Sequence, residues 1–221
     1  THHGKWIKVL TSRGWLLINL GMGGEILLTE SGNLPVKHRV VFTFEDSSAL
    51  SINFWWFGYT FFAELDRLDQ IAMLSKLGPE ILSVSEHDFI NAIHTSKPRT
   101  RLKGFLLDQS NFSGIGNAYI HDILFLAGLH PDRRIGSISD EEIILLYQAI
   151  RDGLLPSIAK GGAFYELDLS GKKGGFQMED ILIGYKENLP CPKCGKPIIK
   201  IRTGSTNSYI CPGCQPLGEV E

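Results

Sequence analysis

Four cysteines near the end of the chain constrain its fold more than any other feature. They form two close pairs, Cys191 with Cys194 and Cys211 with Cys214, separated by sixteen residues. Two such pairs can place four thiolates around one tetrahedral ion, the ligand set of structural zinc. Two disulfides or a redox pair are the alternative, disfavoured because a Cys-x-x-Cys disulfide is strained and no secretory signal is seen. We therefore predict one structural zinc ion in a β-hairpin.

The charge of this hairpin differs from that of the whole chain. Between the first and last cysteine the charged residues are all basic, namely Lys193, Lys196, Lys200 and Arg202, whereas the chain as a whole has a formal charge of -2. Contact with nucleic acid must therefore come from local patches. The hairpin fits nucleic-acid binding or docking on a protein, and the cysteine spacing does not choose between them. The absence of a long apolar run predicts an intracellular protein without membrane contact.

The pattern of apolar residues divides the chain into a β-rich part and a helical part. Alternating runs predict antiparallel strands at residues 6–10, 15–20, 25–28, 40–44 and 49–54. From about residue 86 the period is helical, with Ser85 expected to cap a helix over 86–93 and Ser139 one over 140–150. The sequence thus predicts a multi-domain α+β fold.

A glycine-rich turn lies between two predicted helices. In the segment Phe112 to Tyr119, glycines 114 and 116 precede Asn117. A turn of this kind places backbone N–H groups and the Asn117 amide at a helix start, where a phosphate is favoured. The alternative is a tight helix–helix connection without a ligand. The turn alone does not decide between them.

Several motifs together carry a family resemblance. They are Leu107-Asp108-Gln109, Gly114-Ile115-Gly116-Asn117-Ala118-Tyr119, Ala127-Gly128-Leu129-His130-Pro131, the terminal Cys-Pro-x-Cys-Gln, Leu20-Gly21-Met22-Gly23-Gly24 and Leu77-Gly78-Pro79-Glu80. This set, spread over nearly the whole chain, closely resembles the formamidopyrimidine-DNA glycosylases, relatives of endonuclease VIII that excise oxidised bases. The resemblance implies part of an antiparallel β-sandwich at 1–72, a linker at 73–85, a helix-two-turn-helix domain at 86–186 and a zinc finger at 187–221.

The resemblance also implies a chemistry. The family flips the damaged nucleotide out of the duplex and attacks its sugar C1′ with the amine of an N-terminal proline, while a glutamate moves protons. Neither residue is in this chain, whose Lys5 resembles the family's active-site lysine about fifty residues into the family pattern. We therefore expect an amino-terminal piece to precede Thr1 in the enzyme. Lys5 or the Thr1 amine as a substitute nucleophile is a weaker alternative.

The family's DNA contacts map onto this chain with some changes. Met22 matches a methionine that fills the gap left by the flipped base, and Trp55-Trp56-Phe57-Gly58 replaces an Arg-Arg-Phe-Gly strand end, so Trp56 is either an apolar wedge or a packing residue. The family's phosphate-binding arginine falls at Thr206, with Arg202 nearby. By the same matching, the other expected DNA contacts are Lys5, His38, Lys103, Asn117 and, in a loop near the lesion, Lys172.

Three functional hypotheses follow. The first is a base-excision-repair glycosylase and AP lyase that acts on double-stranded DNA containing oxidised bases or abasic sites, as a monomer associated with the nucleoid in the cytoplasm. The second is a truncated or degenerate relative that binds damaged DNA without cutting it, because the arginines are lost. The third is a zinc-dependent protein-interaction piece. Salt-sensitive DNA binding separates the first two from the third.

Overall fold

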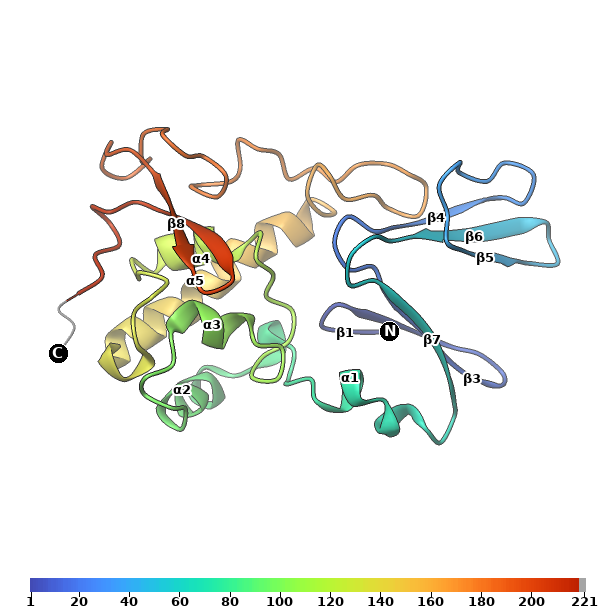
Figure 1. The fold of residues 1–221 in the computed structure, drawn as a ribbon, viewed down its shortest axis with the longest axis horizontal. Coiled ribbons are helices and arrows are strands. Elements are labelled where there is room, and N and C mark those ends of the chain that lie inside the picture. The colour runs from blue at the N-terminus through green and yellow to red at the C-terminus, as the bar shows by residue number, and fades with distance from the viewer. Residues whose placement is uncertain (219–221) are drawn as a thin grey trace. The chain divides into compact units, whose positions relative to one another are not determined.

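The computed structural model describes residues 1–218, which divide into two compact units (Figure 1). One, here called the β unit, comprises residues 1–76 and 157–177. The other, the helical unit, comprises residues 77–156 and the chain from Met178 onward. The segment 157–177 therefore returns to the β unit after the chain has built most of the helices.

Two antiparallel sheets form the β unit. One has the order β1 (His2–His3), β2 (Trp6–Leu10), β3 (Gly14–Asn19) and β7 (Tyr59–Glu64); the other has the order β4 (Glu25–Glu30), β6 (Ser48–Asn53) and β5 (Val40–Thr43). The strands predicted from alternation are confirmed. Strand β7, which the sequence pattern did not single out, completes the first sheet by pairing with β3 along its whole length.

The connections between the two sheets lie side by side. The chain crosses from one sheet to the other between β3 and β4 and again between β6 and β7. Because β3 pairs with β7 and β4 pairs with β6, both crossovers occur at the same end of the strands. Met22 N donates a hydrogen bond to Trp56 O at 2.9 Å, which joins the two crossovers.

Within the β unit, backbone hydrogen bonds hold the segment 163–176. Its ends pair with each other, since Phe164 N donates to Phe176 O at 2.9 Å. Near its tip, Leu169 O accepts a hydrogen bond of 2.8 Å from Leu28 N of β4. A single 3-10 turn (Leu68–Gln70) and the short helix α1 (Ala72–Ser75) end the first stretch of this unit.

The helical unit packs its helices around one apolar cluster. Its elements are η2 (Ile81–Ser83), α2 (Glu86–His94), α3 (Leu102–Leu107), α4 (Ile120–Leu126), η3 (Ile135–Ser137) and α5 (Asp140–Ala159), of which the residues from Ser157 onward belong to the β unit. Both predicted caps are confirmed, because Ser85 Oγ accepts from Asp88 N and Ser139 Oγ accepts from Glu142 N. The Glu142 carboxylate in turn accepts from Ser139 N at 2.9 Å, which makes a capping box.

Helix α5 is longer than the sequence pattern predicts. The expected end at Ile150 is wrong, since the helix continues to Ala159 with Pro156 inside it. Leu154 is buried in the apolar cluster, so packing stabilises the additional turns. Among residues 1–218, no helix is long and apolar enough to cross a bilayer.

A two-stranded hairpin follows the helices. Strands β8 (Ile199–Thr203) and β9 (Thr206–Ile210) pair antiparallel around a two-residue turn at Gly204 and Ser205, where Gly204 has a φ of 61°. A left-handed residue in a two-residue turn is typical of tight hairpins. Ile198 and Cys211 pack with Phe125 of α4 in a second apolar cluster. The predicted β-hairpin is confirmed.

Candidate functional site

The four cysteines meet at the base of the hairpin. Their sulfur atoms all lie within 4.8 Å of one another. Cys191 Sγ is 3.8 Å from Cys214 Sγ, and Cys194 Sγ is 3.3 Å from Cys211 Sγ. Four thiolates at zinc–sulfur distances of about 2.3 Å lie about 3.8 Å apart in a tetrahedron, so the cluster fits zinc. With four thiolate ligands, the ion has no open position for catalysis.

Hydrogen bonds from two side chains to backbone groups connect the region of this cluster to the helices of the same unit. Gln215 Oε1 accepts from Cys211 N at 3.0 Å, while Gln215 Nε2 donates to Leu129 O at 2.9 Å. On the other side, the Asp122 carboxylate of α4 accepts three backbone N–H groups, at distances of 2.7 to 2.9 Å, from residues 182–184. Asp122 thus holds the turn that leads into the zinc hairpin.

Lys103 of α3 is a buried anchor for the hairpin. The residue is 3% exposed, and the three N–H groups of Nζ are shared among four oxygen atoms at 2.7 to 3.2 Å. The acceptors all belong to the hairpin: the hydroxyls of Thr203, Thr206 and Ser208 and the carbonyl of Asn207. Burial lowers the pKa of Lys103 to about 8, partly offset by Asp132. A phosphate contact by Lys103 stays a prediction, and its burial favours an indirect role through the hairpin.

Thr206, the position matched with the family arginine, is one of these acceptors. Its hydroxyl accepts the Lys103 hydrogen bond at 2.9 Å. A cavity of ≈ 350 Å³ beside it has both Arg101 and Lys103 and both Asp108 and Asp132 in its wall. Opposite charges are therefore balanced there, and charge gives this cavity no preference for an anion.

His121 of α4 lies in an aromatic cage under the hairpin. It is 2% exposed and makes edge-on contacts with Tyr185 and Tyr209, with ring centroids 5.8 and 5.3 Å away. Burial, and to a smaller extent the charge of Lys103, lower the pKa of His121 to about 4. The imidazole is therefore neutral near pH 7, as its apolar surroundings require.

Hydrogen bonds from the Gln109 side chain hold the glycine-rich turn. Gln109 Nε2 donates to Ile115 O at 3.0 Å, and Gln109 Oε1 accepts from Gly114 N at 3.2 Å. Within residues 1–218, Asn117 Oδ1 and Ser113 Oγ are buried polar atoms without a hydrogen-bond partner. Asn117 lies in the turn just before α4, close to the predicted helix start.

The other predicted contacts are on the surface of their units. Lys5, His38 and Lys172 are exposed in the β unit, and Arg202 is exposed on β8. Neighbouring protein atoms desolvate the Lys5 ammonium enough to lower its pKa, although the side chain still reaches solvent. Lys172 lies in the segment 163–176, where its N–H donates to Asp168 Oδ1 at 2.9 Å.

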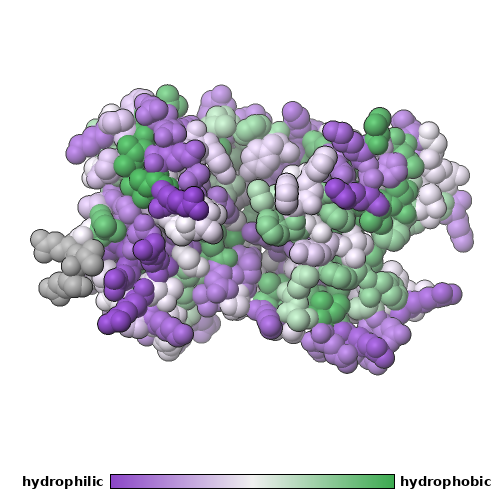
Figure 2. All heavy atoms as spheres, viewed as in Figure 1, coloured by the Kyte–Doolittle hydropathy of each residue, from purple (hydrophilic) through white to green (hydrophobic). Residues whose placement is uncertain are grey.

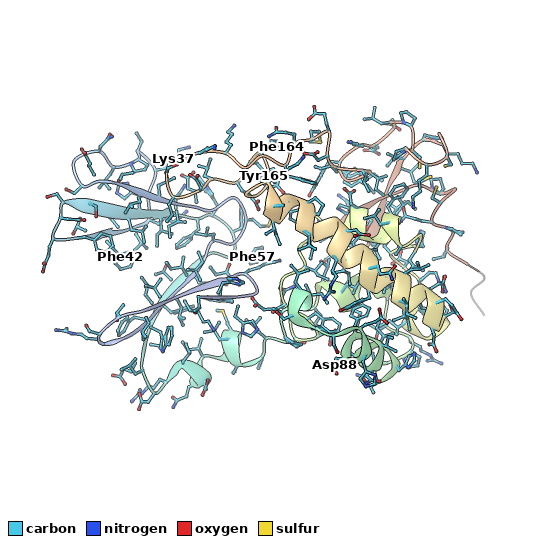
Figure 3. The ribbon with its side chains drawn as sticks, turned by 180° about the vertical axis from the view of Figure 1, so that it is seen from behind. Lys37, Phe42, Phe57, Asp88, Phe164 and Tyr165 are labelled. Atoms are coloured by element: carbon cyan, nitrogen blue, oxygen red, sulfur yellow. The ribbon has the colours of Figure 1, made fainter. Side chains whose placement is uncertain are left out.

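Apolar side chains gather at the two sheet crossovers. We call this surface the crossover patch and define it as Met22, Trp55, Trp56 and Phe57, with the cations Lys37 and Arg39 beside them. Trp56 is 70% and Phe57 69% exposed. Figure 2 shows apolar side chains at the surface over the β-strands, and Figure 3 labels Lys37 and Phe57. The sequence pattern pointed to Met22 and Trp56 but not to the cations, which come from the β4–β5 connection.

Comparison with known proteins shows to which family the chain belongs. Residues 77–167 match the family model of the formamidopyrimidine-DNA glycosylase H2TH domain, and residues 188–217 match the zinc finger found in FPG and IleRS. The formamidopyrimidine-DNA glycosylase of Actinobacillus succinogenes is 33% identical over 227 residues, which cover 97% of this chain and 80% of that protein. The chain belongs to the formamidopyrimidine-DNA glycosylase family. Its four cysteines hold a structural zinc ion.

Solved structures agree with this assignment. The MutM (Fpg) protein of Thermus thermophilus matches with a TM-score of 0.87 and 30% identity, over 99% of this chain and 82% of that one. The Fpg of Lactococcus lactis in complex with DNA containing an abasic site matches with a TM-score of 0.87 and 25% identity, over 98% of this chain and 80% of that one. The predicted α+β fold with a helix-two-turn-helix domain and a zinc finger is confirmed.

Proposed function

We propose that the protein binds double-stranded DNA containing oxidised bases or abasic sites, with the damaged nucleotide turned out of the duplex, as a base-excision-repair glycosylase and AP lyase. The observation that carries this proposal is the match over 98% of the chain to a relative solved with abasic-site DNA. We further propose that it acts as a monomer associated with the nucleoid.

Each predicted contact has a proposed part in binding. Lys5, Lys172 and Arg202 are exposed cations that can neutralise phosphates. Asn117 offers the N–H groups of its side-chain amide, together with neighbouring backbone N–H groups, to a phosphate. His38 lies between two cations in the β4–β5 connection.

A nucleotide that turns out of the duplex leaves a gap in the stack of bases, and apolar side chains can insert into it. Met22 and Trp56 are opposed in an antiparallel bridge, and opposed residues in such a bridge project to the same face. Both are largely exposed. We propose that they enter the gap together, while Lys103 contributes by fixing the hairpin that carries Arg202. We also propose the domain boundaries expected from the sequence, which lie after residues 72, 85 and 186.

Salt-dependent binding tests the proposal. The affinity for a duplex with a tetrahydrofuran abasic analogue should fall steeply as the salt concentration increases. Each neutralised phosphate contributes about -0.9 to the slope of the logarithm of the binding constant against the logarithm of the salt concentration. Lys5→Ala and Arg202→Ala should each reduce the slope by about one. Lys76→Ala, an exposed lysine without a predicted contact, serves as the control and should leave the slope unchanged. Binding without salt dependence would contradict the proposal.

Borohydride trapping on a duplex with a natural abasic site tests the lyase part. An amine that attacks sugar C1′ forms an iminium, which borohydride reduces to a stable adduct. An adduct supports the lyase. Salt-sensitive binding without an adduct confines the function of this chain to recognition. If the unmodified chain forms an adduct, the same assay on Lys5→Ala shows whether Lys5 is the amine. In that case we expect the adduct to persist in Lys5→Ala, because Lys5 is proposed to contact phosphate.

A further inference from the structure

Two arginines lie opposite each other on the surface of the helical unit. Arg101 and Arg134 are opposed in an antiparallel bridge, and opposed residues in such a bridge project to the same face. Two backbone hydrogen bonds, of 2.8 and 3.0 Å, flank the bridge and join residues 100–102 to residues 133–135. Both arginines are exposed. We call Arg101 and Arg134 the arginine pair.

Packing fixes the backbone that carries the arginine pair. Leu102 and Ile135, the neighbours of the two arginines, are buried in the apolar cluster of the unit. Gly136 approaches Pro98 so closely that a Cβ at Gly136 would lie 2.6 Å from the Pro98 Cβ. The two chain segments are therefore held both to the core and to each other. The arginine pair is displayed on this fixed backbone.

The arginine pair carries more positive charge than its neighbours neutralise. Arg101 Nη1 lies 3.3 Å from Asp132 Oδ1, and 62% of the Arg101 side chain is exposed against 23% of the Asp132 side chain. Within residues 1–218, the Arg134 guanidinium has no ion pair, whereas its neighbour Arg133 is paired with Glu142. Like charges directly opposite each other are destabilising, so an anion bound between the two arginines would relieve their repulsion.

The arginine pair adjoins the turn of the zinc hairpin. The cavity of ≈ 350 Å³ beside that turn has Arg101 and Asp132 in its wall together with residues 203–206. The bases and acids of this wall balance each other, and Arg134, which is outside the wall, adds a positive charge that they do not offset. The same hairpin carries the exposed Arg202 on β8. The arginine pair therefore places further cations beside the hairpin, within one unit.

We propose that the arginine pair binds the phosphodiester backbone of double-stranded DNA, and that this contact does not depend on the lesion. The proposal rests on the proposed function and adds a contact that the sequence motifs do not indicate. A guanidinium can donate two parallel hydrogen bonds to one phosphate, which makes arginine a suitable ligand. Contacts to phosphates position a protein on a duplex without reading its bases. The arginine pair should therefore strengthen binding to damaged and intact DNA by the same factor.

Salt-dependent binding of an Arg101→Ala/Arg134→Ala variant tests this proposal. The zinc-loaded protein is titrated against a duplex with a tetrahydrofuran abasic analogue and against an intact duplex of the same sequence. Loss of two phosphate contacts should reduce the magnitude of the logarithmic salt slope by about 1.8 for both duplexes. The loss of affinity caused by the two substitutions should thus become about twelvefold larger as salt falls from about 200 to about 50 mM. The preference for the abasic duplex should be unchanged.

Three further variants separate charge from folding. Arg134→Ala alone leaves the ion pair between Arg101 and Asp132 in place, and it should still reduce the slope by about 0.9. Arg101→Lys/Arg134→Lys keeps both charges and should retain most of the slope. Arg13→Ala removes an exposed arginine from the turn between β2 and β3, at the opposite end of β3 from Met22. This control should change neither slope nor affinity.

Different results overturn this proposal and the proposed function. An unchanged slope in the double variant would show that the arginine pair does not contact the DNA backbone, even if it holds a free phosphate ion. A loss of affinity confined to the abasic duplex would overturn the independence from the lesion. If the unmodified chain binds neither duplex in a salt-dependent manner, the proposed function fails and this inference fails with it.

Discussion

The two units place their apolar and polar side chains in opposite ways. In the helical unit, large aromatic residues such as Phe89 and Phe112 are fully buried in one cluster, whereas in the β unit Trp56 and Phe57 are mostly in solvent. Conversely, the helical unit buries Lys103 and His121, while the β unit keeps Lys37 at the surface beside a tryptophan. The helical unit uses buried side chains to fix a zinc hairpin, whereas the β unit leaves large aromatic side chains exposed.

Zinc removal should have the largest effect, and it should be confined to one region. Structural zinc contributes about 10–16 kcal/mol of apparent binding energy to small zinc modules. A chelator should therefore unfold residues 188–217, while helices α2 to α5, which pack in their own cluster, keep their structure. Hydrogen exchange should show lost protection within residues 188–217, including β8 and β9, and not in helices α2 to α5. Full protection of the hairpin after zinc removal would contradict this account.

Acid should weaken the helical unit through His121. The folded-state pKa of about 4 lies below the ordinary value of 6.5, so the unfolded chain binds the proton first as pH falls. The stability that depends on the neutral imidazole is complete above pH 6.5 and is lost toward pH 4, by up to about 3 kcal/mol. His121→Phe cannot titrate there, so its unfolding free energy should fall less across this range. Parallel pH profiles of the two proteins would contradict the prediction.

The buried Lys103 ammonium should stabilise the hairpin more than an exposed lysine does. Lys103→Met removes the ammonium that bonds four hairpin oxygens, which should cost about 2–3 kcal/mol even though the Thr203 and Ser208 hydroxyls keep their mutual hydrogen bond. Lys200→Met changes an exposed lysine on the same hairpin and should cost less than about 0.5 kcal/mol. Denaturant unfolding of both variants measures the difference. Equal stabilities would show that Lys103 is not the anchor described above.

A pair of glycines tests the rigidity of the crossover patch. Gly21 and Gly23 both have a positive φ, so alanine at either should cost about 1–2 kcal/mol. Only Gly21 faces the backbone of Trp56, and Gly21→Ala must push it away at an additional cost of about 1 kcal/mol or more. Gly21→Ala should also weaken binding to abasic DNA, whereas Gly23→Ala should not. Equal behaviour of the two variants would mean that the patch is not braced as described.

The sequence predicted those features that depend on local spacing. The paired cysteines, the strands near residues 6–10 and 15–20, and the caps at Ser85 and Ser139 each rest on residues close together in the chain. The pattern was less informative where packing decides the outcome. Helix α5 passes through Pro156 because Leu154 and its neighbours pack in the cluster, and a proline in the sequence suggests an earlier end.

Contacts across long stretches of chain could not be predicted. The hydrogen-bond acceptors of Lys103 lie 100 to 105 residues away in the sequence, so a basic run in the sequence gave no sign that this lysine is buried. The crossover patch likewise depends on the pairing of β3 with β7, a strand that was not singled out. Met22 and Trp56 could be matched to a family pattern, but their contact and the cations at Trp55 required the structure.

The most direct test of recognition by the β unit is the affinity of the zinc-loaded protein for an abasic-site duplex compared with an intact duplex of the same sequence. An abasic site leaves one base without a partner, and stacking on such a base is worth about 1–3 kcal/mol. We therefore predict that the abasic duplex binds at least about tenfold more tightly at the same salt concentration. Equal affinity for the two duplexes would contradict the account.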